Sequence, residues 1–116
     1  KVVICDRFSD STLVYQGVLG GLDLLELRQL GNFATDHLVP DLTILLDGDP
    51  EALLLRRRAR GAVDKFELAG LDFQNKVRQG YLALAKEEPE RFFVVDALQN
   101  VAVITAEIVK RLERYK

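Results

Sequence analysis

Three short apolar segments of the chain have the pattern of buried β-strands, and each is followed by an aspartate. They are Val2–Cys5 before Asp6, Leu42–Leu46 before Asp47 and Phe92–Val95 before Asp96. Continuous apolar runs of this length are typical of strands that are covered on both faces of a parallel sheet. We therefore expect three buried strands whose carboxyl ends deliver polar residues.

Apolar residues at helical spacing fill the intervals between these segments. Asp49-Pro50-Glu51 is a strong helix start, because Asp49 can cap free amide groups and Pro50 suits the first turn. The predicted helices are residues 22–33, residues 50–58, one whose face carries Phe73, Val77, Tyr81 and Leu84 and which ends before Pro89, and one from Val101 to Tyr115 with Asn100 as its cap. This alternation predicts an α/β domain, a parallel sheet with flanking helices.

Composition and charge restrict the kind of protein. The 116 residues are 48% hydrophobic and 29% charged, which predicts one globular domain, and the net charge is −2. Nucleic acids and anionic membranes attract basic surfaces, so we expect neither as a partner. No apolar run reaches the ~18 residues of a membrane span. Cys5 is the only cysteine, so an intramolecular disulfide is impossible and we expect a cytoplasmic protein.

A polar cluster directly follows the first predicted strand and runs from Asp6 to Gln16. Asp6 is suited to hold a metal ion or its waters, and the planar guanidinium of Arg7 is suited to clamp a phosphate. The residues suited to hydrogen-bond a polar ring are Ser11, Thr12 and Gln16. A surface ion pair with a helix cap explains the same residues without any ligand.

A second cluster, Arg56-Arg57-Arg58-Ala59-Arg60-Gly61, places four arginines within five residues. Phosphoryl transfer needs fixed positive charge where the transferring group spreads its negative charge, and arginine supplies that charge. Gly61 offers a hinge. A solvated basic helix face explains the run equally simply, with its charge neutralised by Glu51, Asp64 and Glu67. The run has no aromatic interleaving that would support stacking of nucleic-acid bases.

Three further polar residues receive no catalytic role. His37 precedes a predicted strand without a recognisable nucleophile and carboxylate, so we expect a structural loop residue. Strand-end polarity explains Asp47, and helix capping explains Asp49.

In combination the motifs resemble the thymidylate kinase family of bacterial type. The matching residues are Asp6-Arg7-Phe8 with Ser11, Tyr15-Gln16-Gly17, Pro40-Asp41-Leu42-Thr43 leading to Leu46-Asp47, the segment from Arg56 to Glu67, and Phe92 to Ala97. The resemblance implies a P-loop nucleoside monophosphate kinase fold and phosphoryl transfer from ATP to dTMP giving dTDP. It also implies ATP and Mg²⁺ as cofactors and a homodimer. The leucine-rich residues 22–30 are suited to contribute to the subunit interface, and internal packing explains them equally well.

The resemblance also implies roles for individual residues. Arg7 would bind the dTMP phosphate, and Asp6 would lie beside magnesium and the acceptor. The implied substrate-binding residues are Arg7, Ser11, Thr12 and Gln16 for phosphate and base, and Tyr15, which would pack under the deoxyribose and exclude a 2′-hydroxyl. An arginine-rich lid at about 56–70 would supply the catalytic candidates Arg56, Arg58 and Arg60. The residues implied for ATP are Arg56, Arg60, Ala97, Leu98 and Gln99.

Two departures from the family pattern affect these expectations. Lys65 stands in Asp64-Lys65-Phe66-Glu67 where the family usually has arginine, which weakens bidentate phosphate contact there. No Gly-x-x-x-x-Gly-Lys-Ser/Thr loop occurs in the chain, so the cradle for the β- and γ-phosphates is missing.

The missing loop leads to an expectation about the domain. In the family's strand order, 2-3-1-4-5, the three strands predicted here would be the third, fourth and fifth. We expect residues 1–116 to be the carboxyl-terminal part of a single kinase domain, with the first two strands and the P-loop absent. Val2–Cys5 would then lack its neighbouring strand, and the chain alone would lack kinase activity. The alternatives are another P-loop nucleoside or nucleotide kinase, or a non-catalytic binding or assembly module.

Overall fold

The computed structural model describes residues 1–59, 61 and 70–115. Its elements are α1 (Ser9–Thr12), the π-helical η1 (Leu13–Val18), α2 (Leu24–Ala34), β1 (Thr43–Asp47), α3 (Pro50–Ala59), α4 (Leu71–Glu87), β2 (Phe92–Asp96), α5 (Val101–Leu112) and the 3₁₀ turn η2 (Glu113–Tyr115). Within these residues, no helix is both long and apolar enough to span a bilayer.

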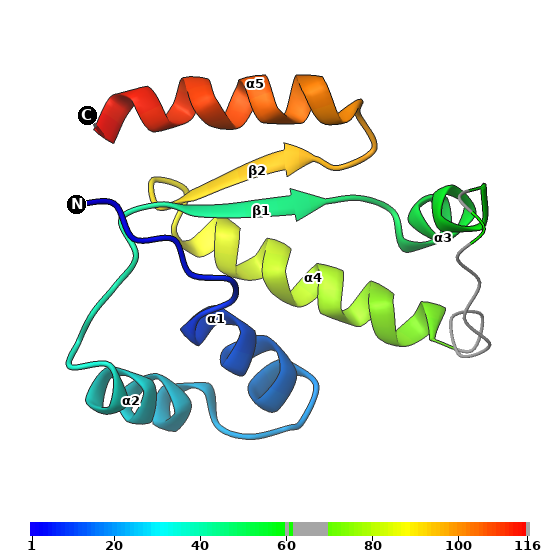
Figure 1. The fold of residues 1–116 in the computed structure, drawn as a ribbon. Helices are drawn as coiled ribbons and strands as arrows, with labels where there is room; N and C mark the ends of the chain where they lie inside the picture. Colours follow the sequence, from blue (N-terminus) through cyan, green and yellow to red (C-terminus); the bar gives the residue numbers. More distant parts are fainter. Residues whose placement is uncertain (60, 62–69, 116) are drawn as a thin grey trace.

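The two strands are parallel neighbours that form the centre of an α/β arrangement. Their register runs from Thr43 opposite Phe92 to Asp47 opposite Asp96, so both strands end in an aspartate as the sequence predicted. Figure 1 shows α5 on one side of the strand pair and α4 on the other, with α3 beyond the carboxyl ends of the strands. The predicted parallel sheet with flanking helices is therefore confirmed.

The first predicted strand is wrong for this structure. Residues 1–5 have no strand structure, and Val2, Val3 and Ile4 are 87%, 86% and 91% exposed. A strand forms only where a neighbour satisfies its backbone hydrogen bonds. The described residues supply no such neighbour for this segment. The strand order of the family leads to the same expectation, because the strand next to Val2–Cys5 would be absent.

The predicted helices are confirmed, together with their capping residues. The Asn100 side chain accepts a hydrogen bond from the Ala102 amide at 2.8 Å, and the Asp49 carboxylate accepts one from the Glu51 amide at 3.4 Å. These bonds satisfy amides that have no partner inside the first turn of a helix. Helix α4 ends before Pro89, and α3 ends one residue beyond the predicted boundary.

The segment from Ser9 to Val18 forms α1 and η1, which the sequence pattern did not predict. Val14 in this segment is completely buried. A Cβ at Gly17 would lie 2.3 Å from Cδ2 of Leu24, and a Cβ at Gly80 would lie 3.1 Å from Cγ1 of Val14. Two glycines thus allow η1 to approach α2 on one side and α4 on the other. The core cluster is Leu13, Val14, Val77, Leu84, Ala85 and Phe92.

Candidate functional site

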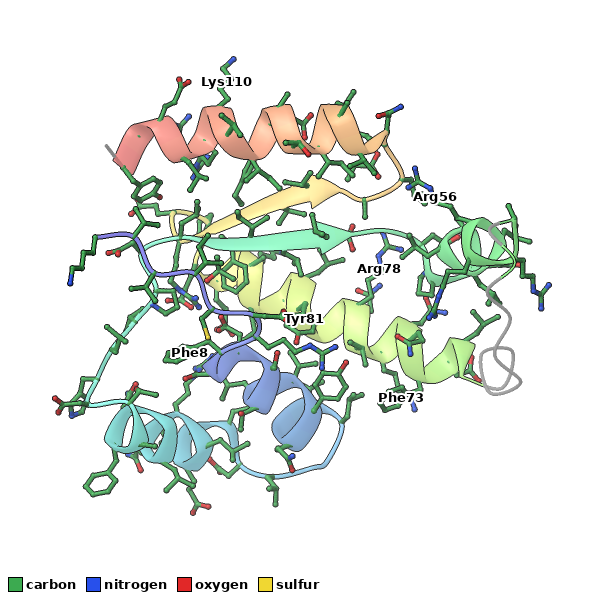
Figure 2. All side chains as sticks on the ribbon, in the orientation of Figure 1. Phe8, Arg56, Phe73, Arg78, Tyr81 and Lys110 are labelled. Atoms are coloured by element: carbon green, nitrogen blue, oxygen red, sulfur yellow. The ribbon has the colours of Figure 1, made fainter. Side chains whose placement is uncertain are left out.

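The carboxyl end of β1 forms an ion pair with α4. The Arg78 guanidinium donates to both carboxylate oxygens of Asp47, with its Nε at 2.9 Å and its Nη2 at 3.2 Å. This hydrogen bond to Asp47 is the main cause that raises the pKa of Arg78. Asp47 was expected only to mark the strand end. In the structure it fixes α4 against the sheet beside α3 (Figure 2).

Arg56 joins α3 to the loop that follows β2. Its guanidinium donates to the carbonyl oxygens of Ala97 at 2.7 Å and Gln99 at 3.0 Å. Asp96 shapes the same loop, because its carboxylate accepts a hydrogen bond from the Leu98 amide at 2.9 Å. The structure therefore brings Arg56 together with the three residues expected near ATP.

The other lid residues are only partly within the described structure. Arg58 lies exposed at the end of α3, and its carbonyl accepts a hydrogen bond from the Gly61 amide at 2.9 Å. Gly61 has a φ of +79°, in the region that favours glycine, so the chain turns at the predicted hinge. Arg60 and the whole segment 62–69, including Lys65, lie outside the described residues.

On the other side of α4, Arg7 and Tyr15 lie together. Arg7 has a left-handed φ of +58°, a conformation that costs a non-glycine residue about 1–2 kcal/mol. Its guanidinium carbon lies 5.7 Å from the centre of the Tyr15 ring. The Tyr15 and Phe73 rings are tilted by 46° with their centres 6.2 Å apart. Strained backbone of this kind is concentrated at functional sites.

The remaining predicted substrate residues follow on α1 and η1. The Ser11 hydroxyl lies 2.6 Å from the Tyr81 hydroxyl, which Figure 2 shows on α4. Thr12 and Gln16 are exposed, so their side chains are open to a ligand. Tyr15 and Gln16 both belong to the π-helical segment, a form of backbone that is frequent at functional sites.

Asp6 is the predicted magnesium ligand. It is exposed and lies one residue before Arg7. Within the described ranges, no group of three or more His, Cys, Asp or Glu side chains is placed to hold a metal ion. Magnesium in kinases is commonly held by one or two carboxylates together with the substrate phosphates, so a single carboxylate at this position fits MgATP as a substrate.

His37 lies exposed in the turn after α2 with a φ of +59°, which agrees with its predicted place in a loop. Sequence reasoning missed Phe73, Arg78, Tyr81 and Arg91 as partners of the candidate site. Each contacts a residue far away along the chain, so local sequence patterns carry no signal for these pairs. Phe73 is the third residue of α4, so its contact with Tyr15 places the acceptor side next to the amino-terminal end of α4.

Comparisons with known proteins show which family the sequence resembles. The family model described as thymidylate kinase matches residues 1–108. The chain is 43% identical to a thymidylate kinase of Syntrophus aciditrophicus, and the match covers 96% of this chain and 54% of that protein. It is 48% identical to one of Geotalea uraniireducens, over 97% of this chain and 57% of that protein.

A third relative is a thymidylate kinase of Caldanaerobacter subterraneus, which is 42% identical over 99% of this chain and 55% of its own length. The chain thus spans about half the length of the curated relatives that it matches. The family model covers residues 1–108 and these relatives are 42–48% identical, so the chain belongs to the thymidylate kinase family.

Proposed function

We propose that the protein transfers the γ-phosphoryl group of MgATP to dTMP, giving dTDP and ADP. In this step an oxygen of the dTMP phosphate forms a bond to the γ-phosphorus as the bond from that phosphorus to the β,γ-bridging oxygen breaks. Catalysis of such a step consists mainly of positioning and stabilising charge. The observation that carries the proposal is the strained Arg7 held beside the Tyr15 ring, which contacts Phe73 near the amino-terminal end of α4.

On the acceptor side, Arg7 binds the dTMP phosphate, because a guanidinium matches two phosphate oxygens with two parallel hydrogen bonds. Tyr15 packs against the deoxyribose, and its ring is already fixed by Phe73. The exposed Thr12 and Gln16, with Ser11 beside them, supply hydrogen-bonding groups for thymine. Asp6 holds the magnesium that accompanies ATP.

On the donor side, the loop of Ala97, Leu98 and Gln99 lies against adenine, and Arg56 keeps that loop in place through its two carbonyls. Arg58 and Arg60 are the candidates for the arginine that stabilises the transferring group. We assign residues 1–116 to the carboxyl-terminal part of one kinase domain, with the lid at about 56–70. This chain by itself is expected to be inactive, since it has no P-loop sequence.

The proposal includes a cytoplasmic homodimer. Helix α2 has exposed apolar residues that suit a subunit interface, namely Leu25, Leu30 and Phe33. Sedimentation of the complete protein tests this part.

The experiment that tests the function is a coupled assay of ADP release by the complete protein that carries this chain. dTMP, dUMP, dGMP and thymidine compete as acceptors in the presence of MgATP. The proposed function requires dTMP to have the highest kcat/KM. A preference for thymidine or dGMP would assign the protein to another nucleoside or nucleotide kinase, and absence of ADP release with every acceptor would favour a non-catalytic module.

A further inference from the structure

Arg91, immediately before β2, lies in the most enclosed ion pair of the described residues. Its Nη1 and Nη2 each donate to a different carboxylate oxygen of Asp10, both at 2.9 Å. The two side chains are only 12% and 14% exposed. Nη1 also donates to the Thr43 hydroxyl at 2.7 Å, and Nη2 donates to the Glu88 carboxylate at 2.5 Å. The guanidinium carbon lies 4.5 Å from the centre of the Phe92 ring.

This network joins parts of the chain that are far apart in the sequence. Asp10 is the second residue of α1. Arg91 belongs to the sheet, since its carbonyl accepts a hydrogen bond from the Thr43 amide at 2.8 Å. The fully hydrogen-bonded Asp10 therefore connects the start of α1 to the amino ends of both strands.

The pair is the first of three contacts that set the position of α1 and η1 along α4 and the sheet. Going along the chain from Asp10, the contacts are Asp10 with Arg91, Ser11 with Tyr81 and Tyr15 with Phe73. Successive partners lie earlier along the chain, so the segment runs antiparallel to α4. Of the three contacts, only the first is a bidentate ion pair. Such a pair fixes both distance and orientation.

We propose that Arg91 is a positioning residue for the acceptor site, acting through Asp10 to hold α1 and η1 at the one axial position that places Arg7 and Tyr15 for dTMP. This inference rests on the proposed function. A slip of one residue along a helix moves a side chain by about 1.5 Å. Misplacement by about 1 Å at a reacting group costs as much as ~10²-fold in rate. The pair can thus affect catalysis although neither residue touches substrate.

A positioning role can be distinguished from a purely structural role, because only a positioning role changes the binding of one substrate and not of the other. Arg91 and Asp10 hold the segment with the acceptor residues, whereas the loop expected at ATP is held by Arg56 and Asp96. Loss of the ion pair should therefore weaken the binding of dTMP and leave the binding of ATP unaffected. A purely structural role would lower the melting temperature and the active fraction while both KM values stayed the same.

The test uses the complete protein that carries this chain, with Arg91→Met, Arg91→Lys, Asp10→Asn and the Asp10→Asn/Arg91→Met double variant. For Arg91→Met and Asp10→Asn we expect KM for dTMP to rise about tenfold, with KM for ATP within about twofold. Arg91→Lys keeps the charge without the bidentate geometry and should show an intermediate KM. The double variant should be no worse than the more affected single variant, because both break the same contact.

Arg28→Met is the matched control. Arg28 of α2 forms an ion pair with Glu87 of α4 at 2.8 Å, which is also a contact between distant parts of the chain. The two side chains are 42% and 56% exposed, and the pair holds no acceptor residue. This variant should leave both KM values unchanged. Hydrogen exchange gives a second measurement, in which Arg91→Lys should speed exchange of amides 9–18 and leave those of α5 unchanged.

Several results would overturn the inference. If wild-type protein phosphorylates dTMP and the KM for dTMP is the same in Arg91→Met, Arg91→Lys and wild type, the positioning role is wrong while the proposed function stands. An equal rise in both KM values would also overturn the inference, because the pair would then not act on the acceptor site alone. Should Arg91→Met fail to fold, Arg91→Lys and Asp10→Asn decide. No turnover of dTMP by wild type would refute the proposed function and the inference together.

Discussion

Gly80 lies in α4 where η1 packs against it, and replacing it with alanine tests how closely the two elements meet. The alanine Cβ would lie 3.1 Å from Cγ1 of Val14, which is closer than the optimal separation of about 3.5–4.0 Å between carbons. Val14 is completely buried and β-branched, so its side chain has few other rotamers to adopt. Either Val14 or the backbone of one element has to shift.

Two opposing free-energy terms set the size of the effect. Alanine in a helix interior is favoured over glycine by about 1 kcal/mol, whereas overpacking in a core costs about 1–3 kcal/mol. Gly80→Ala should therefore destabilise the fold by up to about 2 kcal/mol. Gly31 in α2 is the matched control, because the nearest atom to its Cβ would be Oγ of Ser9 at 3.9 Å. Gly31→Ala should stabilise by about 1 kcal/mol.

Urea unfolding followed by circular dichroism measures both variants. The unfolding midpoint should fall or stay level for Gly80→Ala and rise for Gly31→Ala, with unchanged slopes. The difference between the two free energies of unfolding isolates the crowding at Val14, about 1–3 kcal/mol. If both substitutions raise the midpoint equally, η1 does not pack against α4 at Gly80, and the placement of Tyr15 that depends on it is wrong.

Three further outcomes are expected. Arg56→Met frees the carbonyls of Ala97 and Gln99, so KM for ATP should rise about tenfold with little change for dTMP; steady-state kinetics with each substrate varied would contradict this if both KM values moved together. The hydrogen bond from Arg91 is the main cause that holds the pKa of Glu88 below its ordinary value of 4.5. The charged Glu88 therefore adds stability at pH values above its ordinary pKa, and this contribution is lost as the pH falls through the lower folded-state pKa. Urea midpoints measured from about pH 6 to about pH 3 should fall less for Glu88→Gln than for wild type. Arg58→Ala or Arg60→Ala should lower kcat by about 10³-fold or more while dTMP still binds. Near-full turnover in both variants would show that neither arginine stabilises the transferring group.

Local sequence patterns predicted the elements whose formation depends on nearby residues. The face of α4 follows from apolar residues three and four apart, and Asn100 caps α5 through an amide two residues away. The strand predicted at Val2–Cys5 is not formed, because a strand also needs a partner from elsewhere in the sheet. Helices α1 and η1 were missed because the burial of Val14 and Gly17 comes from packing against α4 and α2, which no period in that segment reveals.

The candidate site likewise has residues that local motifs indicate and contacts that only the fold brings together. Arg7, Tyr15 and Arg56 could be proposed from the sequence because they lie in compact motifs. Their surroundings were not, since Ser11 meets Tyr81 across 70 residues and Asp10 meets Arg91 across 81. An arginine before a strand or in an amphipathic helix looks like a solvated surface residue until the fold brings its carboxylate close. Long-range ion pairs of this kind are therefore the part of the site that sequence alone could not supply.

Recognition of the dTMP phosphate by Arg7 is the central claim, and titration calorimetry of dTMP against thymidine tests it most directly. The two ligands differ only in the phosphate, so their affinity ratio reports what binds that group. For the complete protein we predict a preference for dTMP of at least about tenfold, since a charged bidentate contact contributes well over 1 kcal/mol. The preference should disappear in Arg7→Met and be intermediate in Arg7→Lys. An Arg7→Met variant that still prefers dTMP as strongly as wild type would contradict the claim.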